Sequence, residues 1–209
     1  MASTRRSDWA ESRDALLRAA HELFSDRGYE SVTMKQIAEA AGLTEVTAYR
    51  HFATKAELFE QSAIEPTHDF LQEWVARWRE RPAGERDTAE EGMLFFRELM
   101  AVLTSEQRLM GPLIAAVASG NGGGRLSAKG YRTMSRLLDE LEAIFAEESA
   151  LRGYSDNPRI APRLIMAMAL GITTQKHWLF ATGHVPTDDE LLRELVNFTV
   201  WGLTGPPHR

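Results

Sequence analysis

The chain has 209 residues, of which 44% are hydrophobic, and this predicts a folded protein of one large or two modest domains rather than a disordered chain. It contains no cysteine, which excludes disulfide bonds and every metal or nucleophilic site that needs a thiolate. The formal net charge of −6 argues only weakly against a nucleic-acid partner, because the placement of the charges matters more than their sum.

The first predicted helix runs from about Asp8 to Arg27, with apolar residues at helical spacing that form a buried, supporting stripe. Arg5 and Arg6 lie before it in a polar segment without the apolar core of a secretory signal. This segment is either an arm that reaches a DNA minor groove or a tail without a fixed structure. Gly28 ends the helix.

Residues 33–55 predict a helix-turn-helix. Thr33 and Gln36 have the spacing of a capping box, which opens a short helix with an apolar side. Gly42 then supplies the left-handed backbone of the turn, and Thr44 caps a second helix of about two turns. Because Ala48 and Phe52 face inward together, the opposite side of this helix displays residues suited to nucleic acid: Glu45, Val46, Thr47, Tyr49, Arg50 and His51.

A second capping box, Thr54 with Glu57, opens a long helix that runs to about Arg81, with Lys55 facing outward toward a phosphate. Pro66 removes a backbone donor inside this helix, so a break or kink is expected near Glu65. The kink is either a harmless surface feature or a hinge between the DNA-reading part and the rest.

Five more helices are predicted from capping signals and apolar spacing. Thr88 with Glu91 and Thr187 with Glu190 form further capping boxes, and Asn157 caps a helix with Pro158 at its first position. The glycine-rich residues 119–124 lack the strand and the Gly-Lys ending of a phosphate-binding loop, which favours a linker. With no two-residue alternation, the predicted fold is all-α, with about nine helices: a three-helix helix-turn-helix domain (1–54) and a larger C-terminal helical bundle (55–209).

The pattern A-A-x-x-L-F-x-x-x-G-Y from Ala19, T-x-x-x-I-A-x-A-A-G-L-T from Thr33 and T-x-Y-x-H-F-x-x-K-x-x-L from Thr47 resembles the TetR/AcrR family of bacterial transcriptional regulators. The resemblance implies a homodimer that binds a near-palindromic double-stranded DNA operator, and a small-molecule effector that releases it. It also implies contacts to DNA, mostly to its backbone, from matching positions: Lys35, Thr47, Tyr49, His51 and Lys55.

Two positions depart from the family pattern, which often has Lys or Arg at the position of Glu45 and Gly at that of Val46. A carboxylate repels phosphate but can accept a hydrogen bond from cytosine, and valine methyls can contact thymine. Arg50 is expected to contact either a guanine base or a phosphate. We add Thr44, at the start of the recognition helix, to the predicted DNA-binding residues.

The C-terminal part predicts an adaptable apolar pocket, because it is rich in methionine and aromatic residues. The candidates, each also a plausible core residue, are Phe70, Trp74, Phe96, Met100, Met134, Met166, His177 and Trp178. The last two helices are expected to form the dimer interface or, alternatively, to fill the protomer's own core, through Leu164, Ile165, Met168, Leu191, Leu195 and Phe198.

No catalytic motif is present, and six scattered histidines do not have the spacing of metal ligands, so neither an enzyme nor a cofactor is expected. The longest apolar run, 164–172, is far shorter than the ~20 residues of a membrane span, so the expected protein is soluble, cytoplasmic and without a membrane partner. The remaining alternative is a helical sensor or partner-binding protein that no longer reads DNA.

Overall fold

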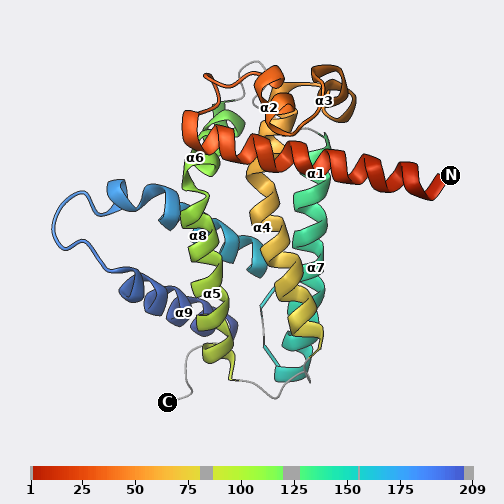
Figure 1. Cartoon of the computed structure of the whole chain (residues 1–209). Helices are drawn as coiled ribbons and strands as arrows, with labels where there is room; N and C mark the ends of the chain where they lie inside the picture. The colour runs from red at the N-terminus through yellow and green to blue at the C-terminus, as the bar shows by residue number, and fades with distance from the viewer. Residues whose placement is uncertain (1, 81–86, 120–127, 155, 205–209) are drawn as a thin grey trace, which may run out of the picture. The chain divides into compact units, whose positions relative to one another are not determined.

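The computed structural model describes residues 2–80, 87–119, 128–154 and 156–204, and in these ranges it is entirely helical and turn, without a strand (Figure 1). The all-α prediction is therefore confirmed. None of the helices in the described ranges is both long enough and apolar enough to cross a membrane. In chain order the helices are α1 (Ala2–Arg27), α2 (Met34–Ala40), α3 (Glu45–His51), α4 (Lys55–Arg79), α5 (Thr88–Ser105), α6 (Gln107–Ser119), α7 (Ala128–Arg152), α8 (Ala161–Leu179) and α9 (Asp188–Thr204).

The chain forms two compact units. The first comprises Met1–Pro66 with Arg108–Tyr131, and the second comprises Thr67–Gln107 with Arg132–Arg209. Three of the described helices contribute residues to both units: α4, α7 and, through Gln107 alone, α6. The functional division at residue 54 remains a prediction, and the predicted glycine-rich linker falls almost wholly on residues 120–127, outside the described ranges.

In the first unit, α1 packs against α2 and α3, and α2 packs against α3. The core is built from fully buried apolar side chains that each helix contributes, among them Leu16, Phe24, Ile37 and Phe52. The apolar stripe predicted for the first helix is therefore confirmed. This helix is longer than predicted: α1 begins at Ala2, so the backbone at Arg5 and Arg6 is helical and does not form an extended arm.

The predicted break at Pro66 is absent, because α4 continues through this residue and the packing of its buried side chains, such as Ile64 and Leu71, offsets the cost of the proline. A kink or hinge at Pro66 stays a prediction. Two predictions about helix starts are wrong. Asp87, and not Thr88, caps α5, since the Asp87 carboxylate accepts from the backbone N–H groups of Ala89 and Glu90. Asn157 forms a separate turn, and α8 begins only at Ala161.

In the second unit, α5 packs against both α8 and α9. Phe96, Leu99 and Leu103 of α5 are almost completely buried. They belong to the apolar core of this unit, together with buried residues of the last two helices such as Ile165 and Leu195. This core encloses the cavity described below.

The capping box of α9 predicts a pH-dependent contribution to stability. The hydrogen bond from the Thr187 backbone N–H, then that from its hydroxyl, and then His184 lower the pKa of Glu190 from 4.5 to about 2. Because the pKa is lower in the folded state, the ionised carboxylate stabilises the protein above pH 4.5. This stabilisation is lost as the pH falls through 4.5 toward about 2.

We therefore expect Glu190→Gln to lower the midpoint of thermal unfolding near neutral pH, and the difference from the wild type to shrink as the pH approaches 3. Circular dichroism at a series of pH values measures both midpoints. Glu194→Gln, an exposed substitution on the same helix, is the control. A difference in unfolding midpoint between Glu190→Gln and the wild type that stays constant with pH would contradict the lowered pKa of Glu190.

Candidate functional site

The helix-turn-helix forms as predicted, through local hydrogen bonds. The Thr33 hydroxyl accepts from the Gln36 backbone N–H at 3.2 Å, and the Gln36 side chain accepts from the Thr33 backbone N–H at 2.9 Å. Gly42 has a φ of 69°, a conformation that favours glycine. The Thr44 hydroxyl then caps α3 by accepting from the Thr47 backbone N–H at 3.2 Å.

The helix α3 has one buried and one exposed side. Ala48 and the following Phe52 are completely buried, as predicted. Val46 is 72% exposed and Tyr49 is 49% exposed. The other residues predicted to face DNA and found exposed are Lys35, Thr44, Glu45 and Arg50, while Thr47 is half-buried. We call this exposed side of α2 and α3 the reading face, and its contacts to DNA remain a prediction.

One predicted DNA-binding residue, His51, packs against a residue that the sequence reading did not single out. The imidazole of His51 lies 3.7 Å from the ring of Trp9 on α1, measured between centroids. The Arg50 guanidinium lies 5.9 Å from the centroid of the same ring. The sequence could have indicated this contact. Trp9 precedes the buried Leu16 by seven residues, so both lie on the same face of the helix.

Lys55 does not face outward, and that prediction is wrong. Its ammonium donates to the backbone carbonyl oxygens of Tyr29 and Val32, at 2.9 Å and 3.0 Å. It also lies 4.1 Å from the centroid of the Tyr29 ring. The first turn of α4 is thereby tied to the segment between α1 and α2. Sequence spacing could not find this contact, because its partners lie 26 and 23 residues away.

A chain of side-chain hydrogen bonds also ties α4 to the end of the reading face. The Arg13 guanidinium of α1 donates to Gln61 at 2.7 Å, and the Gln61 amide donates to Glu57 at 3.0 Å. The second oxygen of the Glu57 carboxylate accepts from the backbone N–H of Ala53, just after α3, at 2.9 Å. The start of α4 therefore holds α3 in position from its C-terminal side.

Replacing Lys55 by methionine is expected to lower the free energy of unfolding of the protein by about 1–2 kcal/mol, because two charge-assisted hydrogen bonds at a partly exposed site are lost. Urea unfolding followed by circular dichroism measures the change. Lys35→Met is the matched control, because Lys35 is exposed and its ion pair with Glu39 is long, at 3.9 Å. Equal effects of the two substitutions would show that the Lys55 hydrogen bonds do not matter.

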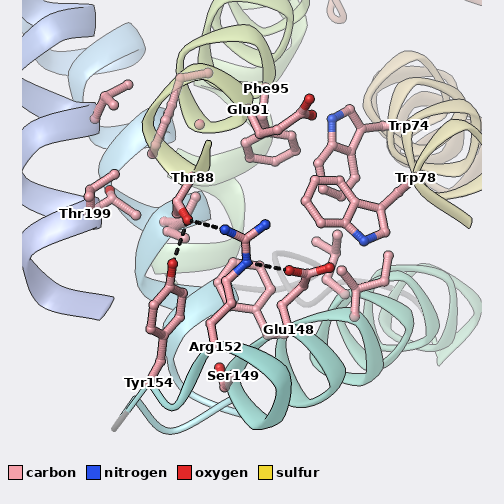
Figure 2. Close-up of a pocket in the computed structure, with 18 residues that line it drawn as sticks. Trp74, Trp78, Thr88, Glu91, Phe95, Glu148, Ser149, Arg152, Tyr154 and Thr199 are labelled. Atoms are coloured by element: carbon pink, nitrogen blue, oxygen red, sulfur yellow. Dashed lines mark hydrogen bonds and ion pairs between the residues drawn. The ribbon is translucent and has the colours of Figure 1, made fainter. Parts of the chain in front are cut away.

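The second unit contains a cavity of about 90 Å³. Its wall is almost entirely apolar and comes from α4, α5, α7, α8 and α9. Six of the described side chains that line it are aromatic: Trp74, Trp78, Phe95, Phe96, Phe145 and Tyr154. The rings of Trp74 and Trp78 stack with their centroids 4.9 Å apart, and Phe95 meets Trp74 edge-on at 4.7 Å (Figure 2).

Polar side chains gather at one end of this cavity (Figure 2). The Arg152 guanidinium donates to the Glu148 carboxylate at 2.7 Å and to the Thr88 hydroxyl at 2.9 Å. The Thr88 and Tyr154 hydroxyls share a hydrogen bond of 2.5 Å. Burial opposes the charge of Arg152, but the hydrogen bond and charge of Glu148 outweigh it and raise the pKa of the guanidinium. We call Thr88, Glu148, Arg152 and Tyr154 the polar end.

The structure brings only two of the eight predicted ligand-binding residues to the cavity wall, Trp74 and Phe96. Phe70 and Met166 are buried away from the wall, and Met100 and Met134 are half-buried. His177 is exposed and Trp178 is 76% exposed, so neither is the polar end of this cavity. Sequence reasoning missed the polar end, because its four residues come together from α5, α7 and the loop after α7.

The six predicted dimer-interface residues fall into two groups. Ile165, Leu191 and Leu195 are buried within the protomer. Leu164 and Phe198 are 57% and 74% exposed, and Met168 is half-buried. These last three residues line one groove between α8 and α9, together with Ile160, which is 50% exposed. We call these four residues the α8–α9 apolar surface.

Comparisons with known proteins agree with this architecture. Residues 16–61 match the family model of bacterial regulatory proteins of the TetR family. The chain is 41% identical over 174 residues to the HTH-type transcriptional regulator TcmR of Streptomyces glaucescens, which covers 80% of this chain and 73% of that protein. Its fold resembles that of Salmonella enterica GusR, with a TM-score of 0.65 and 20% identity over 92% of this chain and 95% of that one. It also resembles the Thermus thermophilus repressor FadR, solved with lauroyl-CoA, with a TM-score of 0.59 and 19% identity over 94% and 98%.

Proposed function

The chain belongs to the TetR family of bacterial regulatory proteins, and we propose that it is a repressor that binds a near-palindromic operator as a homodimer and is released by a small, largely apolar effector. One observation carries this proposal: the single helix α4 holds the reading face with its first turns and lines the cavity with Trp74 and Trp78 near its end.

The reading face supports the DNA-binding part of the proposal. Its hydroxyl and cationic groups suit phosphate oxygens, which set the register of the protein on the duplex. The exposed Glu45 and Val46 stand where bases would be read, and their chemistry favours a cytosine N4 amino group and a thymine methyl. The operator is therefore expected to differ from those of relatives that carry other residues there.

The α8–α9 apolar surface supports the homodimer. Exposed leucine and phenylalanine side chains on adjacent helices are costly in water, and a second copy of the chain could cover them. In a dimer, two copies of α3 would enter successive major grooves about 34–36 Å apart. Because docking depends on this spacing, a shift of a few ångströms would release the DNA.

The helix α4 couples ligand binding in the cavity to the position of the reading face. A ligand that displaces Trp74 or Trp78 moves the helix whose first turns bond to Tyr29, Val32 and, through Glu57, Ala53. The apolar wall of the cavity suits a largely apolar effector. FadR of Thermus thermophilus was solved with lauroyl-CoA, whose acyl chain is also apolar.

Introducing glutamate at both Leu164 and Phe198 is expected to weaken dimerisation by at least about 100-fold, because two carboxylates per chain would be buried in an apolar interface. Sedimentation equilibrium should give the mass of a monomer for this variant and of a dimer for the wild type. Leu151→Glu, at a 59% exposed position on α7, is the control and should stay dimeric. A monomeric wild type would contradict the proposed homodimer.

Selection of bound sequences from random duplex DNA tests the proposed function as a whole. The expected result is one enriched site with two related half-sites about one helical turn apart. Enrichment of no sequence, with and without compounds that fill the cavity, would favour the alternative of a sensor that no longer reads DNA. A turnover assay that finds chemical conversion of a bound compound would instead indicate an enzyme.

A further inference from the structure

The aromatic part of the cavity points to the shape of its ligand. Trp74 and Trp78 lie with their rings stacked, and Phe95 presents its ring edge-on to Trp74 (Figure 2). Such walls offer ring faces and edges, with which a flat aromatic molecule gains more than an aliphatic chain of equal area. Few rotatable bonds in the ligand also mean a smaller entropy loss on binding.

The polar end supplies a place for one hydrogen-bonding group. The Thr88 hydroxyl accepts from Arg152 and shares a hydrogen bond with the Tyr154 hydroxyl, in which either oxygen can be the donor. Hydroxyl pairs of this kind can rotate to donate to a carbonyl or to accept from a phenol. The polar end is therefore suited to a hydroxyl or a carbonyl group on the ligand.

The charges around the cavity disfavour an anion. Among the described residues that line it, Arg152 is the one basic residue, and its guanidinium is paired with Glu148 at 2.7 Å. The side chains of this pair are only 16% and 12% exposed. A second carboxylate, that of Glu91, also lines the cavity. A carboxylate or phosphate inside would lose its hydration and would lie beside these carboxylates and a guanidinium that is already paired.

We propose that this cavity binds an uncharged aromatic molecule with one hydroxyl or carbonyl group. Its rings lie against Trp74 and Trp78, and its polar group meets Thr88 and Tyr154. The proposal rests on the proposed function in one respect, that the cavity is the effector site.

Isothermal titration calorimetry of the full-length protein with three probes tests the class of ligand. The probes are 2-naphthol, its anionic counterpart 2-naphthoate and the aliphatic 1-octanol. We expect 2-naphthol to bind at least about tenfold more tightly than either of the others. Equal or tighter binding of 2-naphthoate or 1-octanol, or no detectable binding of 2-naphthol, would overturn the proposal.

A change of charge tests whether the polar end selects against anions. In Glu148→Gln, Arg152 loses its paired carboxylate, and we expect the affinity for 2-naphthoate to rise at least about tenfold while that for 2-naphthol changes less than about threefold. Glu147→Gln, at the exposed neighbouring position on α7, should change neither affinity. If Glu148→Gln fails to fold, Glu91→Gln removes the other carboxylate and should change the preference in the same direction. An unchanged affinity for 2-naphthoate in a folded Glu148→Gln or Glu91→Gln variant would overturn the charge argument.

Substitution of Trp78 tests whether the aromatic wall favours an aromatic ligand. We expect Trp78→Leu to weaken the binding of 2-naphthol about fivefold and to leave that of 1-octanol unchanged, because only the aromatic probe gains from the ring. Equal losses for both probes would indicate that the wall contributes only apolar area.

Calorimetry and DNA binding separate the two proposals. Binding of 2-naphthol at the cavity without any effect on bound operator would sustain the ligand class and contradict the proposed function. Release of operator by 2-naphthoate or 1-octanol, but not by 2-naphthol, would sustain the function and contradict the ligand class.

Discussion

Replacing both Tyr49 and Arg50 by alanine is expected to weaken operator binding by at least about 100-fold while leaving the fold intact. Each side chain is exposed, so truncation removes no core packing. A bidentate base contact is worth about 1–3 kcal/mol, loss of a phosphate contact weakens binding to every sequence, and a homodimer would lose two copies of each contact. Fluorescence anisotropy with the selected duplex measures the affinity, and circular dichroism measures the fold.

Arg79→Ala is the control for the loss of one positive charge per chain. Arg79 is exposed at the end of α4 and belongs to the unit without the reading face. We expect it to reduce operator affinity by less than about threefold. An Arg79→Ala effect as large as that of the double variant would mean that overall charge, and not the reading face, sets the affinity.

Phe96→Ala is expected to lower the free energy of unfolding by about 3–5 kcal/mol, because Phe96 is 1% exposed and its removal enlarges the cavity that it lines. Binding of an aromatic probe such as 2-naphthol should restore part of the lost stability, since a ligand that binds only the folded state stabilises it by mass action. Thermal and urea unfolding with and without the probe measure both effects.

Leu94→Ala is the matched control on the same helix, since Leu94 is 39% exposed and does not line the cavity. Its effect on the free energy of unfolding should stay below about 1 kcal/mol. A loss for Phe96→Ala no larger than that for Leu94→Ala would indicate that the cavity wall relaxes freely around position 96.

Local chemistry allowed the helix-turn-helix to be predicted from the sequence. The capping box of Thr33 and Gln36 and the left-handed turn at Gly42 each depend on residues within a few positions of one another. The buried pair of Ala48 and Phe52 follows from the same helical periodicity. Their geometry could therefore be worked out without knowledge of the rest of the chain.

Contacts between distant segments were the ones that local patterns could not predict. Lys55 has the sequence context of an exposed first-turn residue, but it bonds to carbonyl groups of the segment before α2. Thr88 has the spacing of a capping residue, but Asp87 caps α5, and the Thr88 hydroxyl bonds to Arg152 and Tyr154 instead.

The same limit applies to the cavity. Aromatic and methionine content predicted an apolar pocket, but content does not tell which side of each helix faces the interior. Trp74 and Phe96 face the cavity, whereas Trp178 is mostly exposed. The polar end consists of charged and hydroxyl residues from different parts of the chain, and only tertiary packing brings them together.

The measurement that tests the central claim most directly is fluorescence anisotropy of the selected operator duplex, titrated with the wild-type protein at rising 2-naphthol concentrations. The predicted result is specific binding that weakens at least about tenfold when the cavity is saturated, which corresponds to a coupling free energy of about 1.4 kcal/mol between the two sites. An operator affinity that stays the same with the cavity filled, or the absence of any sequence-specific binding, would contradict it.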